Sequence, residues 1–350
     1  MIKAILKHAA AVLLGVLILD AFCAWYYNPA PYQRPEARST DKIRRPGAWT
    51  SQAKEGAGTL RMDENGYNNP PDKYGDGISV LMMGSSHTEA FNVPGEMNAS
   101  RRLEAMLRAD GRAGRVYNIG VSSHTFPHNA ANLARALERF RPTDYVVIET
   151  DNIIFRWRLV NRAMEDTLKR LSLHASSLPA YLTDRPLLKQ LYRQYWALRS
   201  RVDSLEDEDE DGEEAALAEP EAGAGYSDDL IARYRAGMTD WFRLLNQQAA
   251  DAGVRLIIYY HPRMTLNMDG SMTFNTNPQC LPAFAGACAD AGVIFIDMTG
   301  EFLRAYEQDH VVAKGFANTA LATGHLNREG QRLVAEAIYR AIRQAEGETT

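Results

Sequence analysis

An almost wholly apolar run ends in a glycine–serine turn at residues 78–88, which read ISVLMMGSSHT. Near-continuous apolar runs of this length are typical of strands buried on both faces of a parallel sheet. Ligands bind at the carboxyl ends of such strands, and Gly84 allows the backbone to turn sharply there. Ser86 is therefore the best candidate for a nucleophile in this sequence.

Four more strand-like runs follow, and helical patterns lie between successive runs. This alternation predicts a parallel sheet that is covered by helices on both faces. We expect a three-layer α/β/α fold, a doubly wound parallel sheet with a flavodoxin-like strand order. The four further runs lie at residues 116–119, 145–149, 254–260 and 293–297.

A histidine precedes the last helical pattern. His325 lies in the segment ATGHLNREG at residues 322–330, and apolar residues recur at helical spacing from Gln331 to Ile342. A serine after the first strand and a histidine before the last helix are one way to build a Ser–His pair on a doubly wound sheet. The alternative is that His325 makes only a local hydrogen bond where the helix begins.

The composition suits one domain with additions. The chain has 350 residues, 45% of them hydrophobic and 24% charged, and its net charge is −5. Its basic residues are scattered, so we expect no nucleic-acid partner. The sequence has no glycine-rich phosphate-binding motif and no metal-ligand spacing, so we expect no cofactor and no metal. On one helix, Cys280 and Cys288 would lie about 12 Å apart, too far for a disulfide, and they could pair only if Cys280 precedes the helix.

The N-terminus carries a membrane-spanning pattern. Residues 9–27 contain a single charge, Asp20, and end in the aromatic residues Trp25, Tyr26 and Tyr27. Such a segment can span about 30 Å of hydrocarbon and place its aromatic residues at the interface. We expect residues 1–27 to form a short cytoplasmic stub and an uncleaved signal anchor, with the rest of the chain on the periplasmic or extracellular side of the cytoplasmic membrane. A cleaved signal peptide is the alternative.

The remaining chain divides by composition. Residues 28–77 are rich in proline, glycine and charge, and predict a tether followed by an irregular lead-in. We expect the α/β domain at residues 78–345, with a helix-rich insertion at residues 153–202. An acidic linker at residues 205–225 should be disordered, because ten carboxylates and no basic residue lie between Glu206 and Glu221.

Four blocks of the sequence, taken in order, resemble those of the SGNH or GDSL-type hydrolases. The first contains the turn at Ser86, and the second reads VYNIGVS at residues 116–122. The third reads DYVVIETDN at residues 144–152, and the fourth reads GHLNREG at residues 324–330. The resemblance covers about residues 78–342 apart from the insertion, and it implies the fold expected above together with a serine hydrolase activity.

The resemblance also implies roles for individual residues. Ser86 would be the nucleophile and His325 the general base. The N–H groups of Ser86 and Gly120 and the side chain of Asn152 would form the oxyanion hole. Three further residues are candidates for the lining of the same cleft: His261, Asp151 and Thr323.

Three departures from the family pattern matter. Ser85 stands where the family usually has an aspartate before the nucleophile, and the third block lacks the glycine of the usual Gly-x-Asn-Asp. Most importantly, Thr323 and Ala322 stand where an aspartate would precede the histidine. A backbone carbonyl, or a carboxylate from elsewhere such as Asp309, would then have to orient His325.

The expected activity is that of a serine esterase or acyltransferase that works through an acyl-Ser86 intermediate. Its substrate would be an ester-bearing small molecule or a polysaccharide. The membrane location favours adding or removing O-acetyl groups on an envelope or exported polysaccharide. The alternative is a catalytically inactive protein of the same fold that binds carbohydrate or serves in assembly, and a third interpretation is a flavodoxin-like small-molecule binder that uses the loop 84–88.

Overall fold

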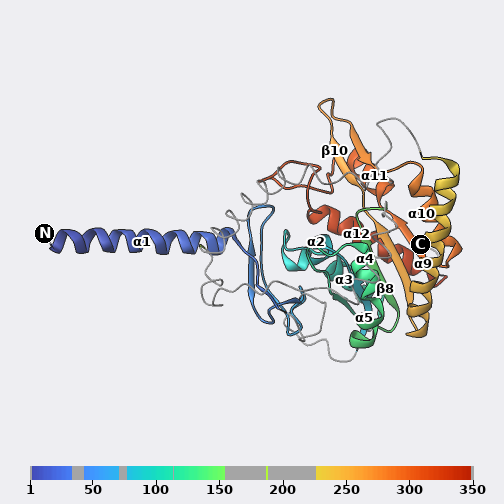
Figure 1. Ribbon diagram of the computed structural model, residues 1–350, viewed down its shortest axis with the longest axis horizontal. Helices are drawn as coiled ribbons and strands as arrows, with labels where there is room; N and C mark the ends of the chain where they lie inside the picture. The colour runs from blue at the N-terminus through green and yellow to red at the C-terminus, as the bar shows by residue number, and fades with distance from the viewer. Residues whose placement is uncertain are drawn as a thin grey trace, which may run out of the picture.

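The computed structural model describes residues 2–33, 43–70, 77–112, 114–153, 187 and 226–347. The expected helical insertion and acidic linker lie outside the described residues, apart from Ile153 and Leu187. Figure 1 shows one long helix, α1 (Ile2–Tyr26), projecting from an α/β domain.

Five strands form a central sheet in the order β12-β9-β8-β6-β7, and every neighbouring pair is parallel. In chain order, the first strand of this sheet, β6, lies between the second, β7, and the third, β8. The fourth strand, β9, and the fifth, β12, extend the sheet beyond β8. This is the predicted flavodoxin-like order. The strands are β6 (Ile78–Met83), β7 (Arg115–Asn118), β8 (Tyr145–Thr150), β9 (Arg255–Tyr260) and β12 (Ile294–Asp297).

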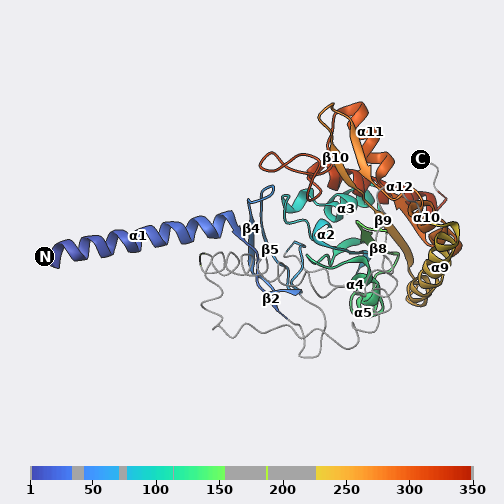
Figure 2. The ribbon, with the colours of Figure 1, turned by 45° about the horizontal axis from the view of Figure 1, so that its top comes forward.

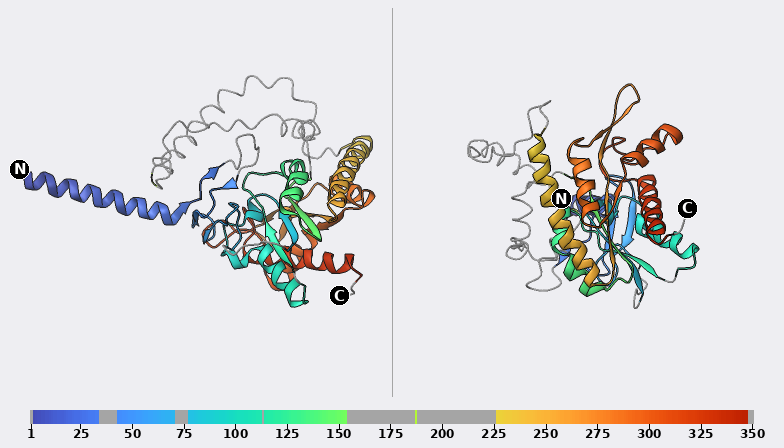
Figure 3. Two further views of the ribbon diagram at one scale, coloured as in Figure 1. Left: turned by 90° about the horizontal axis from the view of Figure 1, so that it is seen from below. Right: turned by 90° about the vertical axis from the view of Figure 1, so that its right-hand side faces the viewer.

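Helices cover both faces of the sheet, so the predicted three-layer α/β/α fold is confirmed. Alternate strand residues point to two separate cores: Leu81 and Ile258 belong to one core, and Val80 and Ile257 to the other. Figure 3 shows α9 and α12 on opposite sides of the sheet. The first core is covered by α4 (Phe126–Ala131), α5 (Leu133–Phe140), α9 (Asp228–Asp251) and α10 (Cys280–Asp290), and the second by α3 (Ala99–Ala109), α11 (Thr299–Asp309) and α12 (Arg328–Ala345).

Smaller elements connect these layers. The helix α2 (Ser86–Glu89) follows β6 directly, and the 3₁₀ turn η1 (Gly95–Met97) precedes α3. A hairpin of β10 (Arg263–Leu266) and β11 (Met272–Asn275) follows β9. Cys280 and Cys288 both lie on α10, where both thiols are buried and free.

The segment between α1 and β6, which we expected to be a tether and an irregular lead-in, contains five short strands. β1 (Tyr27–Asn28), β4 (Trp49–Gln52) and β5 (Gly58–Arg61) form an antiparallel sheet. β2 (Tyr32–Gln33) pairs with β3 (Ile43–Arg44). We call residues 27–33 and 43–70 the N-terminal module.

The N-terminal module packs against the α/β domain. Its Leu60 and Met62 share a small core with Phe91, which follows α2. Arg44 also forms a buried ion pair with Glu89 at the end of α2, with 2.9 Å between Nε and Oε1. Figure 2 shows the module between α1 and α2. The module is thus part of the folded unit that surrounds the carboxyl end of β6.

The helix α1 is exposed over residues 2–19 and has a mean hydropathy of 2.0 in its most apolar window, whereas Cys23 near its end is buried. By length and composition it is the one helix in the described part of the chain that could cross a membrane. The same properties fit an N-terminal membrane anchor or a signal sequence.

Candidate active site

Ser86 begins α2 immediately beyond the carboxyl end of β6. The Oγ of Ser85 caps this helix by accepting a hydrogen bond from the His87 N–H at 3.2 Å. A side chain at Gly84 would collide with Thr88 Oγ1 and Glu149 Oε2, so only glycine permits this tight turn. The local sequence therefore places the Ser86 hydroxyl at the carboxyl edge of the sheet, as predicted from the glycine–serine turn.

His325 reaches Ser86 from the loop before α12. Its Nε2 lies 2.8 Å from Ser86 Oγ, although the two residues are 239 positions apart in the sequence. Asn327 fixes the start of the helix, because its Oδ1 accepts hydrogen bonds from the Glu329 and Gly330 N–H groups at 2.9 and 3.1 Å. The structure thus brings together the two residues that the sequence suggested as nucleophile and base.

The third member of the arrangement is Glu55, in the loop between β4 and β5 of the N-terminal module. Its Oε2 lies 2.7 Å from His325 Nδ1, and its Oε1 accepts the His325 backbone N–H at 2.8 Å. An ionised carboxylate can only accept, so Nδ1 carries the ring proton and Nε2 is free to accept the proton of Ser86. Burial alone would raise the pKa of Glu55, but its hydrogen bonds from His325 lower that pKa on balance.

The loop that carries Glu55 is held on both sides. Asn318, from the loop before α12, accepts the Gly56 N–H at 2.9 Å and donates to Ala53 O at 2.9 Å. Asn92 donates from Nδ2 to the Glu55 carbonyl at 2.8 Å. Gly56 has a φ of 71°, a left-handed conformation that favours glycine. The carboxylate is therefore positioned by backbone contacts as well as by His325.

A second buried carboxylate supports the nucleophile turn. Glu149, at the end of β8, accepts hydrogen bonds from the Ser85 N–H at 2.7 Å and from Ser85 Oγ at 2.7 Å. It also accepts from Thr88 Oγ1 at 2.6 Å and from His261 Nε2 at 3.0 Å. Burial opposes ionisation of Glu149, yet the hydrogen bonds, that of His261 foremost, lower its pKa to about 2. Glu149 thus supplies the negative charge that Ser85, in place of an aspartate, does not.

Three imidazole rings lie next to one another beside Ser86. The ring of His87 lies between those of His261 and His325, with centroids 4.4 and 5.0 Å away. His87 Nδ1 accepts the Leu326 N–H at 3.2 Å, and desolvation, followed by nearby positive charges, holds the pKa of His87 well below its usual value. His261, expected to line the cleft, is fully buried against Glu149 instead.

Gly120 has a packing role in this structure. Its N–H donates to Asn118 Oδ1 at 2.8 Å, so this N–H is not free to bind a substrate oxygen. A side chain at Gly120 would collide with the Glu89 N–H and with the backbone of Thr88. Gly120 therefore allows the loop after β7 to lie against α2. The resemblance implies a different role, in which the Gly120 N–H binds the oxyanion.

The remaining expected residues lie away from the Ser86 hydroxyl. Asp151 and Asn152 line an open pocket of about 500 Å³ beside Tyr260 and Arg263. Thr323 is exposed, and its hydroxyl donates to Ala320 O at 3.0 Å. The Asn152 N–H donates to Thr150 Oγ1 at 3.2 Å, and the oxyanion role expected of the Asn152 side chain stays a prediction.

Ser86 and His325 line a pocket of about 80 Å³. The N-terminal module forms one wall of this pocket with Tyr27, Pro29 and the end of β4, and the loop after β7 contributes Ser122. The remaining lining residues are Arg44, Phe91 and Asn92. The pocket is thus built jointly by the α/β domain and the segment that follows α1.

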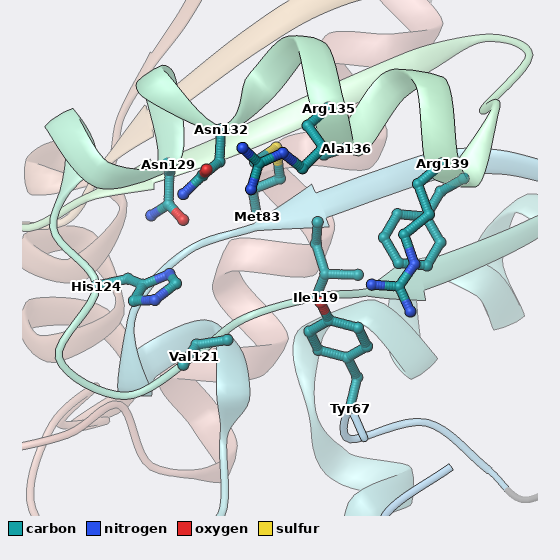
Figure 4. A pocket seen from close by; sticks show the side chains of 11 residues that line it. Tyr67, Met83, Ile119, Val121, His124, Asn129, Asn132, Arg135, Ala136 and Arg139 are labelled. Carbon is teal, nitrogen blue, oxygen red and sulfur yellow. The ribbon is translucent and has the colours of Figure 1, made fainter. Parts of the chain in front are cut away.

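A smaller cavity of about 40 Å³ lies between the sheet and the helices α4 and α5 (Figure 4). Asn129, Arg135 and Arg139 carry polar groups into its lining, and His124 closes it from the loop after β7. Neither Ser86 nor His325 lines this cavity. The loop after β7 therefore separates it from the pocket that holds the Ser–His pair.

Sequence reasoning missed Glu55 and Glu149. Glu149 lies in the third block, where a buried strand ends in a carboxylate. Its position at the carboxyl edge of the sheet could have marked it as a site residue. Glu55 lies in a glycine-rich segment between two short strands, and no local pattern marks it. The absence of an acid before His325 was the only indication that a carboxylate from elsewhere was needed.

Comparisons with known proteins found similar solved structures at low identity. No protein-family model and no curated protein sequence matches the chain. Among solved structures, TesA is 14% identical, with 76% of this chain and 98% of that chain covered and a TM-score of 0.39. The psychrotrophic esterase EstA from Pseudoalteromonas sp. is 13% identical, with 77% and 99% covered and a TM-score of 0.39.

A third solved structure carries a family description. This protein from Desulfitobacterium hafniense, described as lipolytic and of the G-D-S-L family, is 11% identical, with 75% of this chain and 98% of that chain covered and a TM-score of 0.38. The matched structures thus include the GDSL-type hydrolases that the four sequence blocks resemble.

Proposed function

We propose that this chain is an SGNH-type serine esterase or acyltransferase in which Ser86 is the nucleophile, His325 the base and Glu55 the orienting acid. One observation carries the proposal. Hydrogen bonds run without interruption from Ser86 Oγ through the His325 ring to Glu55, at 2.8 and 2.7 Å. Nucleophile, base and acid in this order define serine hydrolases on unrelated folds by their geometry rather than by their sequence positions.

The geometry supports a two-step reaction. His325 Nε2 removes the proton from Ser86 Oγ as the oxygen attacks the ester carbonyl carbon. The resulting tetrahedral intermediate collapses when the bond to the alcohol breaks, and the same Nε2 returns the proton to that alcohol. A water molecule, or the hydroxyl of an acceptor, then attacks the acyl-Ser86 ester by the same route. Glu55 stabilises the imidazolium that forms in each step.

The Ser86 N–H is proposed to bind the intermediate's oxyanion. It begins α2, where an N–H has no partner within the helix. The Gly120 N–H is already bonded to Asn118 Oδ1, and the side chain of Asn152 stays the predicted further donor. Loss of one such donor costs about 2.7–4 kcal/mol of barrier.

The pocket favours a short acyl group and a polar alcohol. Its volume of about 80 Å³ is several times the roughly 10–15 Å³ that one water molecule needs, which supports a short acyl group such as acetyl. Ser51 and Gln52 are half-buried and line it, and such side chains can hydrogen-bond to hydroxyl groups. These features support the addition or removal of O-acetyl groups on a hydroxyl-rich acceptor such as an envelope polysaccharide. We place the α/β domain on the outer side of the cytoplasmic membrane.

A serine-directed fluorophosphonate tests this proposal without knowledge of the substrate. The full-length protein should be labelled, and it should hydrolyse an activated acetyl ester. Ser86→Ala should abolish both signals and leave the melting temperature unchanged, because it removes one oxygen at the first residue of α2. His325→Ala should reduce hydrolysis by a similar factor, since base and nucleophile act as a unit. If the wild-type protein takes up no label and shows no Ser86-dependent hydrolysis, it is instead a binding or assembly protein.

A further inference from the structure

The Ser86 pocket lies directly at the end of the apolar helix α1. Tyr27 and Pro29, which line the pocket, are the first and third residues after this helix. Two residues of extended chain span about 7 Å. Figures 1 and 2 show the same relationship, since the N-terminal module alone separates α1 from α2. The lining of the Ser86 pocket therefore begins within three residues of the end of α1.

The junction between α1 and the pocket wall is fixed by hydrogen bonds. The Ala53 N–H donates to the carbonyl of Tyr26, the last residue of α1, at 2.8 Å. Tyr27 then pairs with Gln52, and Asn28 with Ser51, in the β1–β4 ladder. The helix and the pocket wall form a continuous structure without a flexible spacer, so the orientation of α1 sets the orientation of the pocket.

The end of α1 has the properties of a membrane interface. Its 25 residues correspond to about 37 Å, slightly more than the hydrocarbon thickness of about 30 Å. Trp25 and Tyr26 are 61% and 37% exposed at the end next to the pocket, and such aromatic side chains prefer the headgroup region. If α1 spans the bilayer, the Ser86 pocket is held at the level of the lipid headgroups.

We propose that the substrate of this pocket is a short acyl ester on the polar headgroup of an amphiphile embedded in the same bilayer. This inference rests on the esterase function proposed above and adds the physical form of the substrate. The polar side chains of Ser51 and Gln52, which line the pocket, receive the headgroup, while the lipid tail stays in the membrane. The pocket volume of about 80 Å³ supports a short acyl group on that headgroup.

The test compares two forms of one ester in vesicles of phosphatidylcholine that contain the full-length protein. One form is an acetylated sugar on a synthetic lipid, and the other is the same acetylated sugar free in water. A variant with about 20 Gly/Ser residues between Trp25 and Tyr26 keeps the Tyr26 and Tyr27 contacts but moves the pocket roughly 25 Å from the membrane. A control variant carries the same insert in the exposed β10–β11 turn beside Met268.

We expect the native protein and the control to hydrolyse the lipid-borne ester at least about tenfold faster than the linker variant. All three proteins should hydrolyse the free acetylated sugar at equal rates. Equal rates on the lipid-borne ester in the native and linker proteins would overturn the inference and leave the esterase function intact. If none of the three hydrolyses either ester, the proposed function is wrong, and the inference about its substrate falls with it.

Discussion

Glu55 and His325 are separated by 270 positions in the sequence, and their Oε2 and Nδ1 atoms lie 2.7 Å apart. This contact joins the N-terminal module to the loop before the last helix. It supplies the acid that the sequence around the histidine lacks, and it fixes the ring so that Nε2 faces Ser86. The proposed catalytic arrangement therefore contains a serine, a histidine and a carboxylate, and the carboxylate comes from an unexpected part of the chain.

Glu55→Gln should lower kcat for an activated acetyl ester by about 10²–10⁴-fold with little change in the melting temperature. The amide can donate to Nδ1 and so favour the wrong tautomer, and it cannot stabilise the imidazolium. Steady-state kinetics measure the effect. Glu64→Gln, at an exposed site of the same module, is the matched control and should retain full activity. Wild-type kcat in the Glu55 variant would show that another group orients the ring.

Thr323→Asp should not raise activity. The substitution restores the acid usual in the family, but Thr323 is exposed and the His325 Nδ1 already bonds to Glu55. Combined with Glu55→Gln, it should rescue little of the lost rate, since the side chain at residue 323 is exposed and its hydroxyl bonds to Ala320 O. Kinetics of the single and double variants decide the matter. Substantial rescue would mean that the loop before α12 can rearrange.

Gly120→Ala should reduce both stability and activity, because its methyl group would collide with the backbone of α2 at Thr88 and Glu89. Overpacking of this kind typically costs about 1–3 kcal/mol. Thermal unfolding and ester hydrolysis give the two readouts. Gly95→Ala is the matched control, since nothing lies within 4 Å of the added methyl group. Loss of activity at unchanged stability would instead point to a direct role in binding the oxyanion.

Glu149→Ala should lower the free energy of unfolding by about 3–5 kcal/mol, because it leaves two buried donors, on Thr88 and His261, and two half-buried donors on Ser85 without this acceptor. Urea unfolding near neutral pH measures this loss. Glu138→Ala, on an exposed position of α5, should change the free energy by less than about 0.5 kcal/mol. An equally small effect at Glu149 would show that its hydrogen bonds contribute no net stability.

Lowering the pH should destabilise the protein because Glu149 becomes protonated. The pKa of Glu149 is about 2 in the folded protein against 4.5 for the free group, so its stabilising contribution is complete above pH 4.5 and is lost as the pH falls toward 2. The loss is on the order of 3 kcal/mol. Urea unfolding between pH 6 and pH 3 should show a shallower decline for Glu149→Gln than for the wild-type protein. Parallel declines would contradict the assignment.

The strand order could be predicted from the sequence because each buried strand carries its own apolar run. β6 lies at Ile78–Met83, as expected, and the last strand is only one residue shorter, at Ile294–Asp297. The Ser86–His325 contact followed from the same logic, since parallel strands and the loop before the last helix meet at one edge of the sheet. Local periodicity was sufficient for these features.

The acid and the oxyanion donors required more than local periodicity. Glu55 reaches His325 through contacts of its loop with Asn92 and Asn318, which are distant in the sequence. The Gly120 N–H is taken by Asn118 Oδ1, and only side-chain geometry shows this. The N-terminal module itself has strands of two to four residues, which are too short for a period of two to be recognised.

The position of the triad along the chain has a consequence for synthesis. Glu55 precedes the first strand of the parallel sheet, Ser86 follows that strand, and His325 comes just before the last helix. A growing polypeptide therefore has its acid and nucleophile long before it has its base. Under the proposed mechanism, Ser86 cannot attack an ester until His325 has been synthesised and has folded against it, so synthesis of the nucleophile and onset of its reactivity are separated by 239 residues.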